Sequence, residues 1–385
     1  MRFEFATAGC IVFGAGTVRE VAPAARQMGE RALLVTGLPQ ERAAPLVAGL
    51  EAAGLVCSSL AVEAEPTLDL VRQGVRLARD AGCHLVISIG GGSAIDAGKA
   101  IAALLSNPGE LLDYLEVIGK GQSLKAPSAP FIAVPTTAGT GSEVTRNAVL
   151  ASPEHRLKAS LRSPFMLPRL AVVDPELTLG LPPAVTASTG VDALTQLIEP
   201  YVSIRANPMT DVFCLEGMRL AAGALLQAYL NGRDLGARTD MALASLLGGL
   251  ALANAGLGAV HGFAAPLGGM FAAPHGAVCA ALLPHVMEMN IRALAARASQ
   301  SEPLRRYQSV ARILTGQPDA TAEDGVQWVS QLCRQLQIPP LAACGIQDQD
   351  VPVLVEAASQ ASSMKGNPIT LTPEELREVL TRALS

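Results

Sequence analysis

The sequence predicts two domains, an α/β domain over residues 1–180 followed by an all-α domain over residues 181–385. Three observations support this division. The chain has 385 residues, more than a single compact core usually holds. Up to about residue 180, short apolar runs alternate with helical patterns, which is typical of a parallel sheet covered by helices. Beyond that point, helical patterns follow one another with few strand signals between them.

Apolar runs and helix signals place the elements of the first domain. A helix should follow the first strand to about Ala53, and a second should begin at Pro66 and Thr67, which suit a helix start. A third helix should open from the glycine turn at residues 90–92. We expect strands over residues 32–37, 56–62, 84–90, 131–135 and 169–174.

The second domain reads as a series of apolar and amphipathic helices. One apolar stretch, residues 241–258, approaches the length of a membrane span, but it is rich in glycine and alanine, contains Asn254 and lacks basic flanks. We therefore expect a buried core helix there and no membrane partner. Helices are expected over residues 181–203, 209–230, 239–256, 302–316, 323–336 and 372–384.

The composition favours a small-molecule partner. Aromatic residues make up only 3% of the chain, and the net charge is −5 with no basic run, which argues against binding to nucleic acid. The N-terminus lacks the basic and apolar regions of a signal peptide. The seven cysteines are scattered and never spaced as CxxC, as expected for core thiols of a cytoplasmic protein.

Two loops that follow predicted strands are candidates for binding a dinucleotide. In residues 90–96, GGGSAID, glycines would let the backbone approach a phosphate at a helix N-terminus, although a tight turn is the alternative. Asp96 would either stabilise the helix dipole or bind a ribose hydroxyl. In residues 135–143, PTTAGTGSE, hydroxyls and amides lie at the carboxyl end of a strand, where α/β sheets bind ligands. An exposed turn is the alternative for this loop.

Four side chains of the second domain form a candidate metal site. His261 and His275 lie in residues 258–276, a run of small residues, glycine and proline that can fold back and bring two imidazoles together. Asp192 and Gln196 are four residues apart and share a helix face. Taken singly, each also has a structural interpretation, as a packed histidine, a helix cap or a surface amide.

Together these motifs resemble the iron-containing (group III) alcohol dehydrogenase family over essentially the whole chain. The resemblance implies the dehydroquinate synthase-like fold, with a nucleotide-binding domain, a helical metal and substrate domain, and a cleft between them for a nicotinamide cofactor and a divalent metal, iron or zinc. It also implies a homodimer. The motifs that carry it are IGGGSAIDAGKA, VPTTAGTGSE, Lys158 with SPFMLP and VVDPELT, TASTGVDALTQLIEPYVS, GAVHGFAAPLGG with PHG, and LLPHVMEMN.

The family's site residues can be carried over position by position. The metal ligands would be Asp192, Gln196, His261 and His275, and the two histidines would also be the catalytic residues. Cofactor contacts would come from the glycine and hydroxyl loops and from three further positions. These residues are Gly37, Gly91, Gly92, Ser93, Asp96, Thr136, Thr137, Thr140, Asn147 and Lys158.

The chain departs from the family pattern at two positions. Gln196 replaces a histidine, and its amide oxygen is a weaker donor for zinc or iron, which shifts the preference toward Mg²⁺ or Mn²⁺ or lowers the metal affinity. Ala265 stands where a further histidine is usual, so water or a ribose hydroxyl would have to relay the proton unless His285 approaches the site. Without metal, His261 and His275 would act as proton donors or polarise the carbonyl.

We therefore expect an NAD(P)-dependent enzyme that interconverts a small alcohol and its aldehyde or ketone. Gly37 follows the first strand where a carboxylate would favour NAD, and Arg42 lies downstream, which slightly favours NADP(H). Three alternatives remain: a metal-independent reductase of carboxylated substrates similar to maleylacetate reductase, a lyase or cyclase similar to dehydroquinate synthase, and a nucleotide-binding homologue without turnover.

Overall fold

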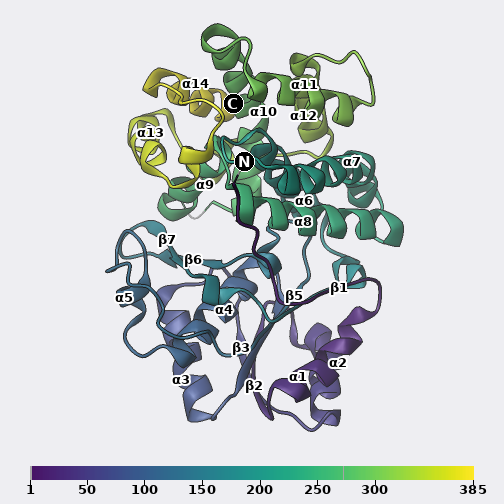
Figure 1. Cartoon of the computed structure of the whole chain (residues 1–385), viewed down its shortest axis with the longest axis vertical. Helices are drawn as coiled ribbons and strands as arrows, with labels where there is room; N and C mark the ends of the chain where they lie inside the picture. The colour runs from purple at the N-terminus through teal and green to yellow at the C-terminus, as the bar shows by residue number, and fades with distance from the viewer. Residues whose placement is uncertain (1, 272) are drawn as a thin grey trace. The chain divides into compact units, whose positions relative to one another are not determined.

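The computed structural model describes residues 2–271 and 273–385 and contains two compact units (Figure 1). The α/β unit comprises Ala6–Thr137 and Gly141–Thr178. The helical unit comprises Leu179–Ser385 together with two short segments, Met1–Phe5 and Ala138–Thr140. The predicted fold class, α/β followed by all-α, is confirmed. The two short segments that cluster with the helical unit were not predicted.

A six-stranded parallel sheet forms the centre of the α/β unit, in the order β1-β8-β5-β4-β2-β3. Every residue of β4 and β5 is buried, because helices cover both faces of the sheet and favour continuous apolar runs. The predicted strands are confirmed, and β1 is an additional one. The strands are β1 (Ile11–Phe13), β2 (Arg31–Thr36), β3 (Val56–Ala61), β4 (Leu85–Gly90), β5 (Phe131–Pro135) and β8 (Leu170–Val173).

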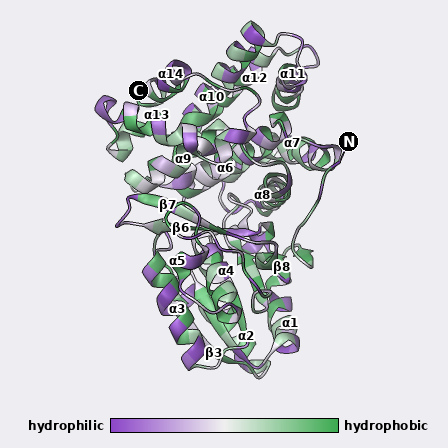
Figure 2. Cartoon of the chain, turned by 60° about the vertical axis from the view of Figure 1, so that its left-hand side comes forward, coloured by the Kyte–Doolittle hydropathy of each residue, from purple (hydrophilic) through white to green (hydrophobic). Residues whose placement is uncertain are grey.

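Side chains of β2 alternate between two hydrophobic cores, one on each face of the sheet. Leu33 and Val35 belong to the core that contains residues of α3 and α4, whereas Ala32 and Leu34 belong to the core that contains residues of α1 and α2. Hydrophilic and hydrophobic residues alternate along α3, as expected for a helix with one face on the sheet (Figure 2). These helices are α1 (Val21–Met28), α2 (Gln40–Ala52), α3 (Leu68–Asp80) and α4 (Gly92–Ser106).

Two features of this unit were absent from the sequence prediction. The antiparallel hairpin of β6 (Asn147–Ser152) and β7 (Leu157–Arg162) packs against α4. A short helix, α5 (Leu111–Tyr114), lies in the long connection between α4 and β5. The hairpin matters for the candidate cofactor site because Asn147 and Lys158 belong to its two strands.

In the helical unit, α6 (Pro183–Val202) packs against α7, α8 and α10 and is buried over most of its second half. The helices predicted from the sequence are confirmed, and α9, α10 and α13 are additional. The others are α7 (Pro208–Leu230), α8 (Leu235–Ala255), α9 (Ala259–Met270), α10 (His275–Arg297), α11 (Glu302–Thr315), α12 (Ala322–Gln335), α13 (Val351–Gln360) and α14 (Pro373–Ala383).

No single helix within the described residues is long and apolar enough to span a membrane. The pair α8 and α9 reaches that length and composition only when taken together, and it is bent by 98°. Within α8, the residues that line the core include Met241, Ala244 and Ala251, which agrees with the predicted core helix.

Candidate metal centre and dinucleotide loops

Helix α6 carries three polar side chains into the core along one face. Asp192, Gln196 and Glu199 are spaced by four and three residues, which places them on neighbouring turns of the same side. Their exposed fractions are 1%, 2% and 5%. Buried polar groups need partners, so this face must meet donors or a cation.

His261 and His275 lie on two helices rather than in a flexible loop. Residues 259–270 form α9, which contains His261, and α10 begins at His275. The expectation that this stretch folds back is right in outcome, because the two imidazole centroids lie 5.4 Å apart. The small residues allow helices to pack closely. If residue 276 carried a side chain, its Cβ would lie only 2.8 Å from the carbonyl oxygen of Ser188 in α6, which is too close for two non-bonded atoms.

Glu199 fixes the orientation of His261. One carboxylate oxygen accepts a hydrogen bond from the amide of Val260 at 2.7 Å, and the other lies 2.6 Å from Nδ1 of His261. The Nδ1–H group therefore donates to Glu199, which leaves the Nε2 lone pair free to bind a metal. Asn367 supports the same helix start by accepting from the amide of Ala259. Glu199 was missed in the sequence, although its spacing from Asp192 on α6 could have indicated it.

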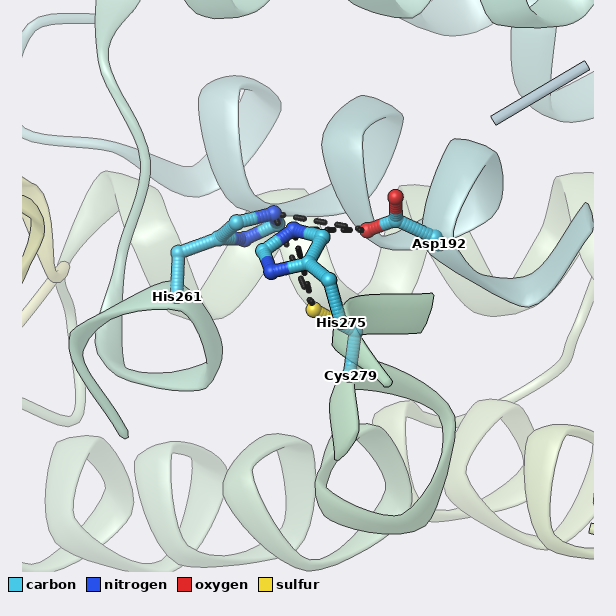
Figure 3. A group of neighbouring side chains, drawn as sticks. All are labelled: Asp192, His261, His275 and Cys279. Carbon is cyan, nitrogen blue, oxygen red and sulfur yellow. Dashed lines mark hydrogen bonds and ion pairs between the residues drawn. The ribbon is translucent and has the colours of Figure 1, made fainter. Parts of the chain in front are cut away.

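The imidazoles converge on Asp192 and on a fourth side chain, Cys279 (Figure 3). Oδ1 of Asp192 lies 3.4 Å from Nε2 of His261 and 3.8 Å from Nε2 of His275. One ligand atom from each of the four residues lies within 4.8 Å of all the others. Cys279 was not predicted to take part, but it follows His275 by one helical turn and so shares its face of α10.

The residues present fit a divalent metal. Oδ1 of Asp192 is buried and accepts no hydrogen bond among the described residues, and its contacts with the two imidazoles are ion-pair contacts at 3.4 and 3.8 Å, an arrangement that a bound cation would stabilise. The donor atoms include a carboxylate oxygen, imidazole nitrogens and a thiol sulfur, all of which bind zinc and related ions.

Electrostatics within the group also favour a cation. Burial by itself raises the pKa of Asp192, but the charges of His275 and His261 hold it below its ordinary value. Burial lowers the pKa of each histidine, but the nearby acidic groups outweigh this effect. The pKa of His275 is therefore raised, and that of His261 is raised well above its ordinary value. Acidic groups thus dominate the surroundings of both imidazole rings. A divalent cation that bound there would displace the protons of the two imidazoles.

Gln196 makes a different contact from the one that the family pattern implies. Its side-chain Nε2 donates to the carbonyl oxygen of Gly139 at 3.0 Å, so the amide holds the segment Ala138–Thr140. That segment also packs tightly on α6. A side chain at residue 139 would place its Cβ only 2.8 Å from Cβ of Thr189, so only glycine allows this approach. The role of Gln196 as a metal ligand stays a prediction.

In the α/β unit, the glycine loops after β2 and β4 lie together. The amide of Gly37 donates to the carbonyl of Ile89 at 2.9 Å, and a Cβ at Gly37 would lie 3.6 Å from Cα of Gly90. Gly90 has a φ of +157°, and a Cβ there would lie 2.7 Å from Ala94. Connections from these adjacent strands lead to opposite faces of the sheet, and such switch points bind ligands in α/β proteins.

The first turn of α4 and the hydroxyl loop after β5 meet at this edge. Gly91 is the N-cap of α4 and has no side-chain cap, and Gly92 and Ser93 form the first turn. A Cβ at Gly91 would lie 3.4 Å from the hydroxyl of Thr137. Thr136 is buried and its amide donates to the carbonyl of Gly90. This edge therefore offers a helix N-terminus and neighbouring hydroxyls, the kind of groups that bind a phosphate.

Asp96 is occupied by contacts within the protein. Its two carboxylate oxygens accept hydrogen bonds from the hydroxyl of Ser142 and from the amide of Val149, and it lies 3.2 Å from the buried ammonium of Lys99. Lys99 in turn donates to the hydroxyl of Thr145. Asp96 therefore ties α4 to the hydroxyl loop and β6, and its contact with a ribose stays a prediction.

The remaining predicted cofactor residues are spread over both units. Asn147 begins β6, and its carbonyl accepts a hydrogen bond from Lys99. Lys158 lies on β7, and its side chain is 4% exposed and forms an ion pair of 3.0 Å with Glu65. Thr140 belongs to the helical unit, whereas the other nine lie in the α/β unit.

Comparisons with known proteins agree with this architecture. The model of the iron-containing alcohol dehydrogenase family matches residues 8–175, and the model of the C-terminal part of that family matches residues 186–384. Alcohol dehydrogenase 4 from Schizosaccharomyces pombe is 40% identical over 324 residues, which are 84% of this chain and 74% of that protein. Lactaldehyde reductase from Escherichia coli is 35% identical and is matched over 95% of this chain and 96% of its own.

Solved structures show the same fold. A 1,3-propanediol oxidoreductase superposes with a TM-score of 0.92 at 34% identity, over the whole of both chains. Sulfoacetaldehyde reductase from Bifidobacterium kashiwanohense, solved in complex with NAD⁺, has a TM-score of 0.87 at 27% identity, over 100% of this chain and 99% of that one. The chain therefore belongs to the iron-containing alcohol dehydrogenase family and is an oxidoreductase that interconverts alcohols and their carbonyl products.

Proposed function

We propose that this enzyme transfers hydride between a small alcohol and a nicotinamide cofactor, and that Asp192, His261 and His275 hold the divalent metal that assists the reaction. The observation that carries this proposal is the buried Oδ1 of Asp192, which has no hydrogen-bond partner among the described residues and lies 3.4 and 3.8 Å from two imidazole nitrogens.

The residues around the metal would position and insulate it. When bound, the metal would act as a Lewis acid that stabilises the developing alkoxide. Glu199 keeps Nδ1 of His261 protonated and turns Nε2 toward Asp192. The exposed fractions of Asp192 and His261 are 1% and 7%, so little water reaches these donors. Ala265 offers no side chain for proton transfer, so we propose that water or a cofactor hydroxyl relays the proton.

We propose that residues 1–180 bind the dinucleotide and that residues 181–385 provide the metal and substrate site. In the first part, the amides at Gly91 to Ser93 would bind the pyrophosphate, and the hydroxyls of Thr136 and Thr137 lie on the adjoining loop. Asp96 and Lys99 keep that loop in place, so their contribution would be to position it.

For the choice of cofactor, we propose that NADP(H) is accepted and slightly preferred. Gly37 at the end of β2 carries no carboxylate to repel a 2′-phosphate. Arg42 is exposed on α2, where one guanidinium nitrogen donates to the carbonyl of Leu177. The test is kcat/KM with each cofactor, for wild type and for Gly37→Asp, which should shift the preference toward NAD(H). A strong preference of the wild type for NADH would overturn this proposal.

We further propose a cytoplasmic homodimer. All seven cysteines are free thiols, which fits a reducing compartment. The dimer follows from the family resemblance and can be checked by light scattering coupled to size-exclusion chromatography. A monomeric mass at micromolar concentration would contradict it.

The metal proposal is tested by removing and restoring the ion. After dialysis against a chelator, kcat/KM for small primary alcohols should fall by at least about 100-fold, because Lewis-acid assistance is worth several kcal/mol. Reloading with Zn²⁺ or Fe²⁺ should restore it, and Asp192→Asn should bind neither ion. Full activity of the metal-free enzyme on a carboxylated ketone would support the metal-independent reductase instead. Cofactor binding without turnover would support a non-catalytic homologue.

A further inference from the structure

Cys279 lies where a metal ligand would lie. It is on α10, one turn after His275, and its side chain is fully buried. Its Sγ lies 3.8 Å from Nε2 of His261 and 3.7 Å from Nε2 of His275. The thiol therefore faces the same point as the two imidazoles and the Asp192 carboxylate (Figure 3).

The spacing of these atoms matches a four-ligand site. Ligands at about 2.0–2.3 Å from a tetrahedral ion are separated from one another by about 3.3–3.8 Å. The two Asp192–histidine distances are 3.4 and 3.8 Å, and the two Cys279–histidine distances are 3.8 and 3.7 Å. Four of the six edges of such a tetrahedron are thus already present.

Cys279 differs from the buried cysteines that only fill the core. Cys333, on α12, lies among apolar side chains, and its thiol donates weakly to the carbonyl of Ala280. Cys279 instead contacts two imidazoles, beside an Asp192 oxygen that is buried and has no hydrogen-bond partner. A thiolate at this position would face the same point as the two imidazoles and the carboxylate, which is the placement that a metal ligand needs.

Gln196, the position that the family pattern assigns to a ligand, makes a structural contact through its amide nitrogen. Its amide nitrogen donates to the carbonyl of Gly139. That contact holds the segment Ala138–Thr140, a structural task that does not need a metal.

We propose that the Sγ of Cys279 is the fourth protein ligand of the metal, together with Asp192, His261 and His275, and that Gln196 is a structural tether. This inference rests on the proposed metal-assisted function and adds a ligand to it. The thiol proton would leave to solvent on binding. The bound ion would supply Lewis-acid assistance to the substrate.

A sulfur ligand changes which ion the site prefers. Thiolates select Zn²⁺ and Co²⁺ and disfavour Mg²⁺ and Mn²⁺, whereas a glutamine ligand would have favoured the latter. We therefore expect the purified protein to contain zinc or iron and to exclude magnesium.

Cobalt spectroscopy tests the proposal without measuring activity. Chelator-treated protein reloaded with Co²⁺ should show a sulfur-to-cobalt charge-transfer band in the near ultraviolet. Cys279→Ser should lose this band while keeping visible d–d bands, and its Kd for Zn²⁺ should rise at least about tenfold. Cys333→Ser is the matched control, since it removes a buried thiol on the neighbouring helix, and it should keep the band. Identical spectra for wild type and Cys279→Ser would overturn the proposal.

X-ray absorption of the wild-type zinc protein removes any dependence on a variant that folds poorly. The fit should require one sulfur at about 2.3 Å. Bound zinc with only oxygen and nitrogen neighbours would refute the role of Cys279 and leave the metal proposal intact. Failure of the wild type to bind zinc or cobalt would instead refute the proposed metal function, and the Cys279 inference with it.

Discussion

At the scale of single residues, Glu199 shows how the candidate metal centre is held. It is 5% exposed and supports both the start of α9, at Val260, and the imidazole of His261. A carboxylate suits this position because the Val260 amide and Nδ1–H of His261 are both hydrogen-bond donors. Each of them needs an acceptor, and a carboxylate offers an acceptor oxygen to both. Its effect on a metal would be indirect, through the orientation of His261.

The Glu199→Gln variant tests this positioning role. The glutamine can satisfy one donor but must turn an N–H group toward the other, so we expect a loss of about 1–3 kcal/mol in the free energy of unfolding. Metal affinity should fall about 10- to 100-fold. Both are measured by denaturant titration of the metal-free protein and by competition with a chromophoric chelator. Glu323→Gln, an exposed site on α12, is the control. Equal metal affinities in the two variants would contradict the role of Glu199.

Glu143 gives a prediction about pH. Burial raises the pKa of its carboxyl to about 7, although a backbone hydrogen bond and Lys99 oppose the shift. In the unfolded chain, Glu143 loses its proton near the ordinary pKa of 4.5, whereas the folded protein keeps it up to about pH 7. The free energy of unfolding therefore decreases as pH rises from about 4.5 toward 7. Glu143→Gln removes the penalty and should gain about 3 kcal/mol over wild type between about pH 5 and about pH 8. Parallel stability curves for the two proteins would rule this out.

At the scale of elements, the site depends on close approach of helices. The start of α10 reaches α6 only because residue 276 is glycine: a Cβ there would lie 2.8 Å from the carbonyl oxygen of Ser188. Since His275 precedes this contact and Cys279 follows it by one turn, both side chains depend on it.

A comparison of two glycine-to-alanine substitutions in helices distinguishes the effect of this close contact from the general effect of alanine on helix stability. Gly276→Ala should cost about 1–3 kcal/mol through overpacking and should weaken metal binding by displacing His275. Gly223→Ala, on α7, has nothing within 4 Å of the new methyl group and should be neutral or stabilise by up to about 1 kcal/mol. Thermal unfolding and a metal titration measure both effects. If Gly276→Ala binds metal as tightly as Gly223→Ala, the close contact does not position the ligands.

The elements also show what the sequence could and could not predict. The strands β2, β4 and β5 were predictable because buried parallel strands are continuous apolar runs. The β6–β7 hairpin was missed because its strands mix buried with half-buried positions and so lack the continuous apolar runs of the central strands. Helix α9 was missed because glycine and proline punctuate it, and its stability comes from packing rather than from propensity.

The same contrast holds within the candidate site. Asp192, His261 and His275 could be picked out from residue type and motif, and the structure brings them together. Cys279 could not, because a lone buried cysteine in an apolar helix has the pattern of an ordinary core residue. The contact of Gln196 with Gly139 could not be predicted either, since it joins residues far apart in the chain.

At the scale of the whole molecule, we propose that the two units divide the chemistry. The α/β unit supplies glycine and hydroxyl loops at the switch point of its sheet, and the helical unit supplies a cluster of candidate metal ligands. The central claim is that this cluster is built around an ion rather than around the hydrogen bonds of its own side chains.

A crystal structure of the purified enzyme, with anomalous diffraction recorded at the zinc and iron edges, tests this claim most directly. We predict one strong anomalous peak at about 2.0–2.3 Å from Asp192, His261 and His275, with Cys279 as the fourth neighbour. A well-ordered site without a peak, in crystals grown from zinc- and iron-supplemented protein, would contradict the account.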